Sequence, residues 1–175
     1  GNLRVLTASD SGEAAHHLFV LDGSLKELGS LNGFSDNETA NESVTAVRFL
    51  KDTVCVSTDR NNRQTNRTVV IDVSDPRRPA VAGAAKTDGY PTLLVPLDDG
   101  TLLGIGHHTV TDGDNERMDE YSNGVKLFLF DVGDKSSPGL LDTAVYLNGD
   151  SPAQYHPKAL LLRAERGEWS IPLKQ

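Results

Sequence analysis

The sequence predicts an all-β fold made of repeated four-stranded sheets, and three features support this. An apolar run that ends in aspartate occurs three times, at residues 18–22, 68–72 and 127–131. A second apolar segment follows each run, and hairpin signals such as Asp98-Asp99-Gly100 recur along the chain. Four short strands that repeat at roughly 40–50 residues are typical of a β-propeller blade, so we predict a β-propeller.

The expected blades follow one another from residue 1 to residue 175 as a single propeller segment. A partial blade of three strands spans 1–31, complete blades span 44–87 and 92–147, and a terminal hairpin spans 157–174. About three four-stranded blades result, whereas a propeller needs at least about four blades to close its ring. We therefore expect either an arc of a larger propeller or a homodimer in which copies of the chain close the ring.

The residue pattern favours strands over helices throughout the chain. β-branched residues and turn formers are frequent, and no segment keeps the apolar spacing of an amphipathic helix. Continuous apolar runs such as Phe128-Leu129-Phe130 suit strands that are buried on both faces between stacked sheets. The single cysteine, Cys55, alternates with valines and is expected to be a small buried apolar residue.

Composition and charge exclude some classes of protein. Hydrophobic residues make up 37% and charged residues 24% of the 175 residues, as in globular proteins. The net charge of −8 repels phosphates, which argues against a nucleic-acid partner. No apolar run reaches the roughly 18–20 residues that a membrane-spanning helix needs, so no membrane span is expected.

The aspartates that end the three repeated strands are Asp22, Asp72 and Asp131. They could form a ring of carboxylates at one end of the propeller. Aspartate after a strand also commonly accepts hydrogen bonds from backbone N–H groups of the turn that follows it. We favour this second interpretation, in which the three residues are structural turn residues.

The most strongly charged segment lies in the long loop 107–124. Asp112, Asp114 and Asp119 are candidate calcium ligands there, because Ca²⁺ prefers several carboxylate and amide oxygens. Their spacing does not match an EF-hand loop, and the alternative is a solvated acidic loop. The adjacent pair His107-His108 opens the loop, but neighbouring residues of a strand point to opposite faces and so rarely bind one ion.

Motifs of the well-known catalytic classes are missing from the sequence. No nucleophile elbow, phosphate-cradling loop or Cys-x-x-Cys pair occurs. Serine, histidine and aspartate are all present, but no spacing singles out a triad. Apart from the calcium candidate, no cofactor is expected.

Segments along nearly the whole chain resemble a known family in the same order. The segments are 3–5, 18–31, 44–50, 70–76, 96–106, 124–132 and 156–162. They are similar to the secreted β-propeller-domain proteins of bacteria and archaea, whose members are generally longer and whose molecular function is not established. The resemblance implies an extracellular or cell-surface location and supplies no catalytic residues.

These observations favour a non-enzymatic binding or scaffolding propeller with a protein or surface ligand. The alternative is a metal-assisted hydrolase of the propeller type. Such an enzyme would use the axial channel or the loop 107–124.

Overall fold

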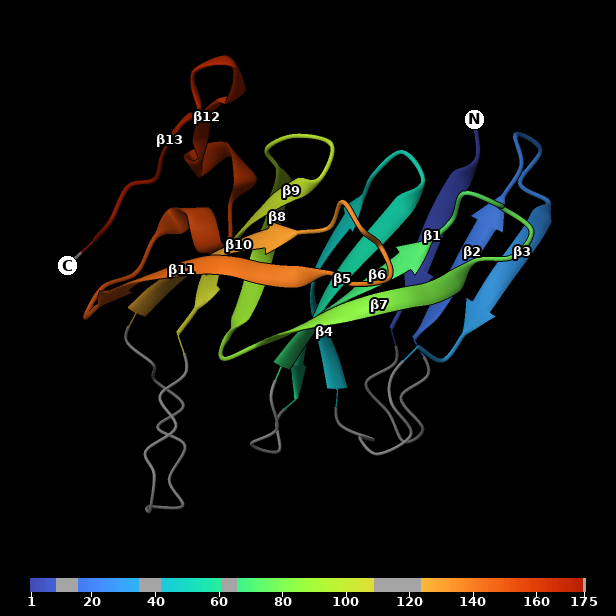
Figure 1. Ribbon diagram of the computed structural model, residues 1–175, viewed down its shortest axis with the longest axis horizontal. Coiled ribbons are helices and arrows are strands. Elements are labelled where there is room, and N and C mark those ends of the chain that lie inside the picture. Colours follow the sequence, from blue (N-terminus) through green and yellow to red (C-terminus); the bar gives the residue numbers. More distant parts are fainter. Residues whose placement is uncertain (9–15, 35–41, 61–65, 109–123, 175) are drawn as a thin grey trace.

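A computed structural model describes residues 1–8, 16–34, 42–60, 66–108 and 124–174. Nearly all regular structure in these ranges is β-strand, which confirms the predicted all-β class. The first sheet has three antiparallel strands in chain order, shown in blue in Figure 1. They are β1 (Leu3–Thr7), β2 (His17–Leu21) and β3 (Glu27–Asn32).

The second and third sheets each have four antiparallel strands, again in chain order. The second sheet contains β4 (Glu42–Phe49), β5 (Thr53–Arg60), β6 (Asn66–Asp72) and β7 (Ala80–Thr87). The third contains β8 (Tyr90–Pro96), β9 (Thr101–His107), β10 (Gly124–Asp131) and β11 (Gly139–Leu147). Sheets of this kind are the blades of a propeller.

The C-terminal segment differs from the long hairpin expected from the sequence. Its elements are η1 (Pro152–Gln154), η2 (Pro157–Ala159), β12 (Leu161–Arg163), η3 (Ala164–Arg166) and β13 (Glu168–Ser170). Only β12 and β13 pair as strands. A proline at residue 157 has no N–H to donate and a fixed φ, so it begins a short helical turn where a strand was predicted.

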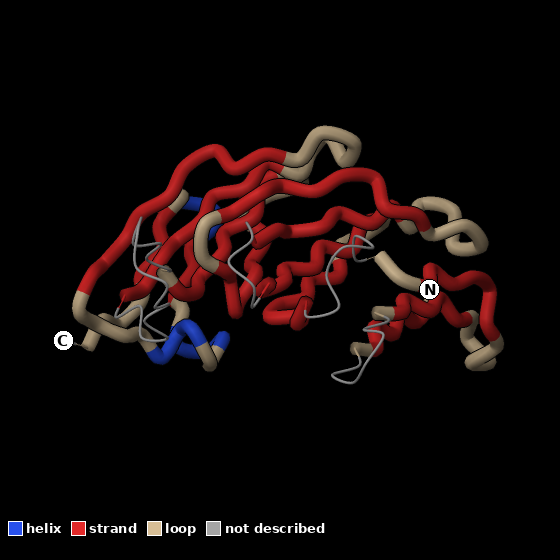
Figure 2. The backbone as a smooth tube through the Cα atoms, turned by 90° about the horizontal axis from the view of Figure 1, so that it is seen from below, coloured by secondary structure: helices blue, strands red, loops and turns tan. Residues whose placement is uncertain are grey.

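The sheets stack face to face along an arc, as Figure 2 shows. One apolar cluster joins the first and second sheets, and a second cluster joins the second and third sheets. A third cluster lies between the outer face of the third sheet and the C-terminal segment, which contributes Ala153 and Ile171. The middle strands are therefore buried on both faces, which explains their unbroken apolar runs.

Cys55 lies in the cluster between the second and third sheets and is fully buried. Burial raises the pKa of its thiol to about 12. The prediction of a small apolar core residue is confirmed, because such a thiol does not ionise at neutral pH.

Two threonines link neighbouring sheets at matching positions. Thr45 lies at a β-bulge of β4 and donates its hydroxyl to Pro91 O at 2.7 Å. Thr92 lies at the matching bulge of β8 and donates to Gln154 O. The segment around Gln154 therefore follows the third sheet in the way that β8 follows the second.

The two ends of the stacked sheets differ in composition. We name the end that carries Asp22, Asp72 and Asp131 the turn end, and the opposite end, with His17, Arg67 and His107, the loop end.

None of the helices in the described ranges has the length and apolarity needed to span a membrane.

Candidate functional site

A cluster of aromatic and polar side chains lies at the loop end of the third sheet. Tyr90 begins β8 and is paired across the sheet with His107, the last residue of β9. Their ring centroids are 5.3 Å apart, and the ring centroid of Tyr155 lies 5.7 Å from that of His107. Tyr155 is 62% exposed, whereas Tyr90 and His107 are half-buried.

Hydrogen bonds around Gln154 fix the state of His107. The Gln154 Oε1 accepts from Ser151 N at 2.8 Å, so its Nε2 is the atom that faces Gly106 O and His107 Nδ1, at 3.0 and 3.2 Å. An amide nitrogen only donates, and His107 Nδ1 must therefore accept. The proton of the neutral ring then lies on Nε2, which is 3.3 Å from the Tyr155 hydroxyl and donates to it.

The pKa directions agree with this arrangement. Burial lowers the pKa of His107, which keeps the ring neutral at neutral pH. Burial is also the main reason that the pKa of Tyr90 is raised, and the negative charge of Asp59 adds to it. The cluster thus presents neutral ring faces and a Tyr155 hydroxyl that is free to donate a hydrogen bond to a ligand.

A buried ion pair lies at the loop end of the second sheet. Arg67 contacts the Glu42 carboxylate twice, through Nε at 2.8 Å and Nη2 at 3.0 Å. The Arg67 Nη2 also donates to Phe34 O at 3.1 Å, and the Glu42 side chain has no exposed surface. A bidentate pair with further hydrogen bonds is the geometry that makes burial of two charges tolerable.

The third sheet has a related pair that is more open. The Lys126 Nζ lies 2.7 Å from the Asp88 carboxylate, and the two side chains are 3% and 72% exposed. Burial works against ionisation of Asp88, but the hydrogen bond and charge of Lys126 outweigh it, so the pKa of Asp88 is lowered. The Lys126 Nζ also lies 5.4 Å from the centre of the Phe128 ring, within range of a cation–π contact.

Basic residues occupy the same position in all three sheets. His17, Arg67 and Lys126 each precede the repeated aspartate of their strand by five residues (22 − 17, 72 − 67 and 131 − 126). The imidazole of His17 is bonded to Asn32 Oδ1 at 3.0 Å. This spacing was visible in the sequence but was not singled out there.

The repeated aspartates lie in turns, and all three accept hydrogen bonds from backbone N–H groups two residues ahead. The Asp22 Oδ1 accepts from Ser24 N at 2.8 Å, the Asp72 Oδ1 from Ser74 N at 3.0 Å, and the Asp131 Oδ1 from Gly133 N at 2.9 Å. Each carboxylate thus holds the turn that follows its strand.

Asp72 has a further partner from the next sheet. The Lys135 Nζ donates to the Asp72 carboxylate at 2.8 Å and contacts the Asp52 carboxylate at 3.3 Å. The bond from Lys135 is the main cause of the lowered pKa of Asp72. Lys135 therefore joins the second and third sheets at the turn end.

The calcium candidates Asp112, Asp114 and Asp119 lie outside the described residues. Within the described ranges, no three His, Cys, Asp or Glu side chains gather as a metal-binding group. The two histidines that precede the candidates have different surroundings. His107 contacts Gln154 and Tyr155, whereas His108 lies near enough to Asp88 to lower the pKa of that carboxyl.

Comparison with known proteins identifies the family. A family model described as Beta propeller domain matches residues 1–175. The chain belongs to the Beta propeller domain family. The stacked sheets are therefore propeller blades, and the resemblance to β-propeller-domain proteins is confirmed.

Two archaeal proteins are similar to this propeller segment. An uncharacterised protein of Archaeoglobus fulgidus is 31% identical over 175 residues, which cover 100% of this chain and 25% of that protein. The uncharacterised protein MJ1554 of Methanocaldococcus jannaschii is 30% identical over 146 residues, or 81% of this chain and 20% of that protein. The chain thus spans a quarter or less of the length of these relatives.

Sequence reasoning missed most of the aromatic cluster. From the sequence, His107 was considered as a metal ligand and disfavoured, and Tyr90, Gln154 and Tyr155 were not singled out. No local motif marks these residues, because they come from strands and turns that meet only in the folded propeller. The bonds of Thr45 to Pro91 and of Thr92 to Gln154, which link successive sheets, are likewise seen only in the structure.

Proposed function

We propose that this chain is part of a non-enzymatic binding or scaffolding propeller of an exported or cell-surface protein. The ligand lies against the cluster of Tyr90, His107 and Tyr155 at the loop end. The observation that carries this proposal is the bonding of His107. Its Nδ1 lone pair is occupied by Gln154 and its Nε2 proton by Tyr155, so the ring supports a binding surface and is not free as a general base.

The chemistry of the cluster favours an uncharged or cationic ligand. Aromatic faces carry partial negative charge and attract C–H groups and cations. The Tyr155 hydroxyl donates to a ligand acceptor, and the negative charge of Asp59 and of the whole chain disfavours anions.

Saturation-transfer NMR with three probes tests the proposal: a methyl glycoside, choline and inorganic phosphate. We expect signals for the glycoside or choline that disappear in Tyr155→Ala, and no signal for phosphate. In the matched variant Tyr155→Phe the ring remains, and we expect weaker binding because only the hydroxyl is lost. Binding of phosphate alone, or equal binding by Tyr155→Ala, would contradict the proposal.

The alternative function, a metal-assisted hydrolase, predicts a different result. Hydrolysis of p-nitrophenyl acetate or p-nitrophenyl phosphate would depend on added Ca²⁺ or Zn²⁺ and would be lost in His107→Ala. We expect no such activity. Calcium at millimolar concentration should also leave the melting temperature unchanged if the loop 107–124 is a solvated acidic loop.

For the closure of the ring, we favour further blades of a longer protein over a second copy of this chain. The first sheet matches the last three strands of a blade, whereas β12 and β13 match the first two. Joining them between copies would supply the second strand of that blade twice. Light scattering of this chain checks this: a mass near 18.9 kDa is expected, and a stable dimer would favour closure by a second copy.

A further inference from the structure

The outer strands of the second and third blades differ at two matching positions. Gly83 on β7 and Asp142 on β11 each follow the repeated aspartate of their blade by eleven residues (83 − 72 and 142 − 131). Lys86 and Val145 each follow it by fourteen residues (86 − 72 and 145 − 131). On β11 an acid thus replaces glycine and an apolar residue replaces lysine.

The glycines on the outer strands leave room for the turn of the following blade, which packs directly against their backbone. A Cβ at Gly29 on β3 would lie 2.7 Å from the carbonyl oxygens of Pro76 and Arg77. One at Gly83 would lie 2.5 Å from Pro138 Cδ and 2.9 Å from Lys135 O. Only glycine admits such a close approach of another backbone.

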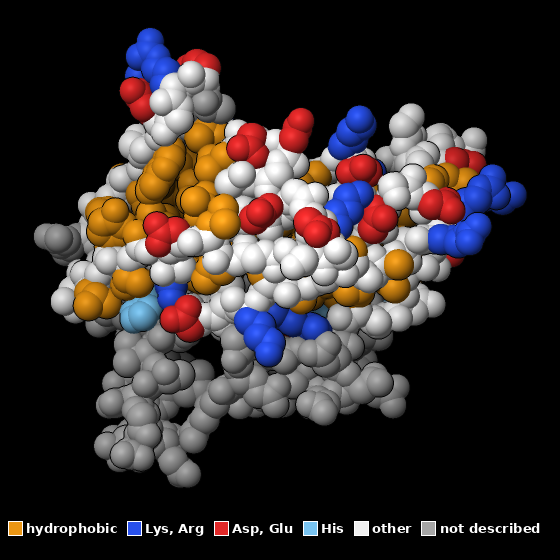
Figure 3. Space-filling model, viewed as in Figure 1, with side chains coloured by type: hydrophobic (Ala, Val, Ile, Leu, Met, Phe, Trp, Pro, Cys, Tyr) orange, Lys and Arg blue, Asp and Glu red, His pale blue; other side chains and the backbone are white. Residues whose placement is uncertain are grey.

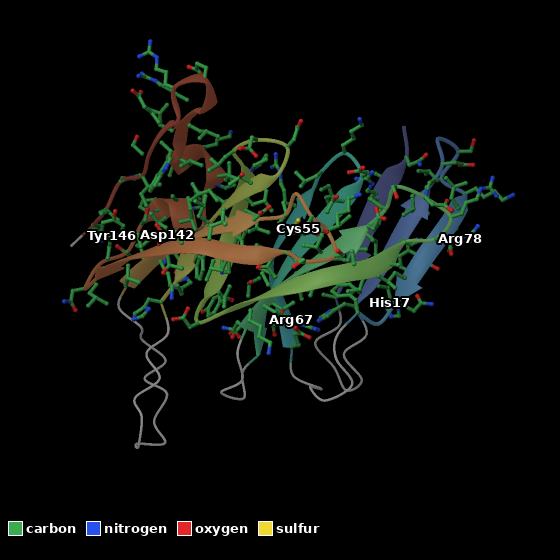
Figure 4. The ribbon with its side chains drawn as sticks, viewed as in Figure 1. His17, Cys55, Arg67, Arg78, Asp142 and Tyr146 are labelled. Carbon is green, nitrogen blue, oxygen red and sulfur yellow. The ribbon has the colours of Figure 1, made fainter. Side chains whose placement is uncertain are left out.

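Asp142 cannot accept a turn of this kind. Its side chain would occupy the space of the turn, and its carboxylate would face carbonyl oxygens of the same partial charge. One oxygen of Asp142 accepts a hydrogen bond from Thr143 N at 2.8 Å. Figure 4 labels it on β11 together with Tyr146. What fits against it is a hydrogen-bond donor, above all a basic side chain.

β11 exposes two large apolar side chains on the face that carries Val145. Val145 and Leu147, which lie on either side of Tyr146 in the strand, are 38% and 61% exposed. Among the described residues, β7 has only Val81 in this class and β3 has none. Figure 3 shows apolar side chains gathered at the end of the molecule that carries β11.

A following blade would not cover Val145. Val145 is paired with Lys126, and its neighbour on the same face, Thr143, is paired with Phe128 of the core between the second and third blades. The side chain of Val145 therefore points toward the second blade, beyond the edge of that core. β11 is also the last strand of its sheet, and no other strand of the described ranges pairs with its outer edge.

We propose that β11 is a docking edge for an extended segment of a partner protein whose residues alternate between apolar and basic. The segment pairs with the free backbone groups of β11, as in β-strand addition. Its basic side chain binds Asp142, and its apolar side chains on the other face pack against Val145 and Leu147. Charge complementarity with the acidic chain favours such a partner over a second copy.

The probe is a fluorescent peptide of the length of β11 that alternates valine and lysine, compared with one that alternates valine and glutamate. In fluorescence anisotropy we expect the valine–lysine peptide to bind at least about tenfold more tightly, equivalent to about 1.4 kcal/mol. Val145→Lys, which gives β11 the residue of β7, should weaken binding by at least about tenfold through lost packing and like charge. Asp142→Gly should remove the preference between the two peptides.

Val81→Lys on β7 is the matched control and should leave binding of the valine–lysine peptide unchanged. Equal binding of the two peptides by the parent chain, or full binding by Val145→Lys, would overturn the proposal. Light scattering of the protein alone tests whether a second copy of the chain, and not a partner protein, occupies this edge. A dimer that is lost in Val145→Lys would assign the edge to a second copy and equally overturn it.

Discussion

The second and third blades share one plan but differ in how firmly they are enclosed. At the loop end, the second blade has the buried, bidentate Arg67–Glu42 pair, and the third has Lys126 with an Asp88 carboxylate that is 72% exposed. At the outer strand, the second blade has Gly83 beneath a turn, and the third has the exposed Asp142. The same backbone plan thus carries a buried ion pair and a glycine beneath a turn in one blade, and a more open ion pair and an acidic residue in the other.

The largest expected effect is at the buried ion pair. Glu42→Ala should lower the free energy of unfolding by about 3–5 kcal/mol, because Arg67 keeps its charge in a buried position without that carboxylate. The matched Asp88→Ala should cost less, about 1–3 kcal/mol, because Lys126 is also buried but water can take the place of the largely exposed Asp88 carboxylate. Urea denaturation measures both variants. Equal losses would show that the two blades do not differ in this way.

A smaller effect is expected at the outer strands. Gly83→Ala should lower the free energy of unfolding by about 1–3 kcal/mol, because the added methyl group overlaps Pro138. Asp142→Ala, at the matching position of the third blade, should change it by at most about 0.5 kcal/mol, as exposed substitutions usually do. Thermal unfolding followed by circular dichroism compares them. A large loss in Asp142→Ala would mean that this position is also packed.

The smallest effect concerns the contact between the blades at the turn end. The pKa of Asp72 is lowered in the folded protein, chiefly by Lys135, so its ionised form stabilises the fold above the ordinary carboxyl pKa. This contribution is lost as the pH falls from about 4 through the folded pKa. Lys135→Met should therefore be less stable at neutral pH by at most about 1 kcal/mol. The difference in free energy of unfolding between Lys135→Met and the parent chain, measured by denaturation, should become smaller as the pH falls. A difference that does not change with pH would contradict this.

The sequence was sufficient for the features that repeat along the chain. The three aspartate-ending runs located the central strands, and the hairpin signals located their partners. Alternating valines around Cys55 correctly indicated a buried strand. These features depend on local patterns of apolar residues and turn formers, which a single sequence displays directly.

The features that were missed depend on contacts between blades. The role of Gly83 depends on a turn near Lys135, 52 residues later in the chain (135 − 83). The state of His107 depends on Gln154, and the pairing of Arg67 depends on Glu42. The terminal hairpin was too long in the prediction because the strand pattern was given more weight than the constraint of a proline at residue 157.

The proposal of a binding propeller depends most directly on the state of His107. Nitrogen-15 NMR of the imidazole across neutral pH reports both its protonation and its tautomer. We expect a neutral ring with the proton on Nε2, which remains neutral at pH values where an ordinary histidine, with a pKa of about 6.5, is half protonated. A ring that is protonated at neutral pH would contradict the bond that His107 Nδ1 accepts from Gln154. A neutral ring with the proton on Nδ1 would free Nε2 as a general base and would also contradict the account.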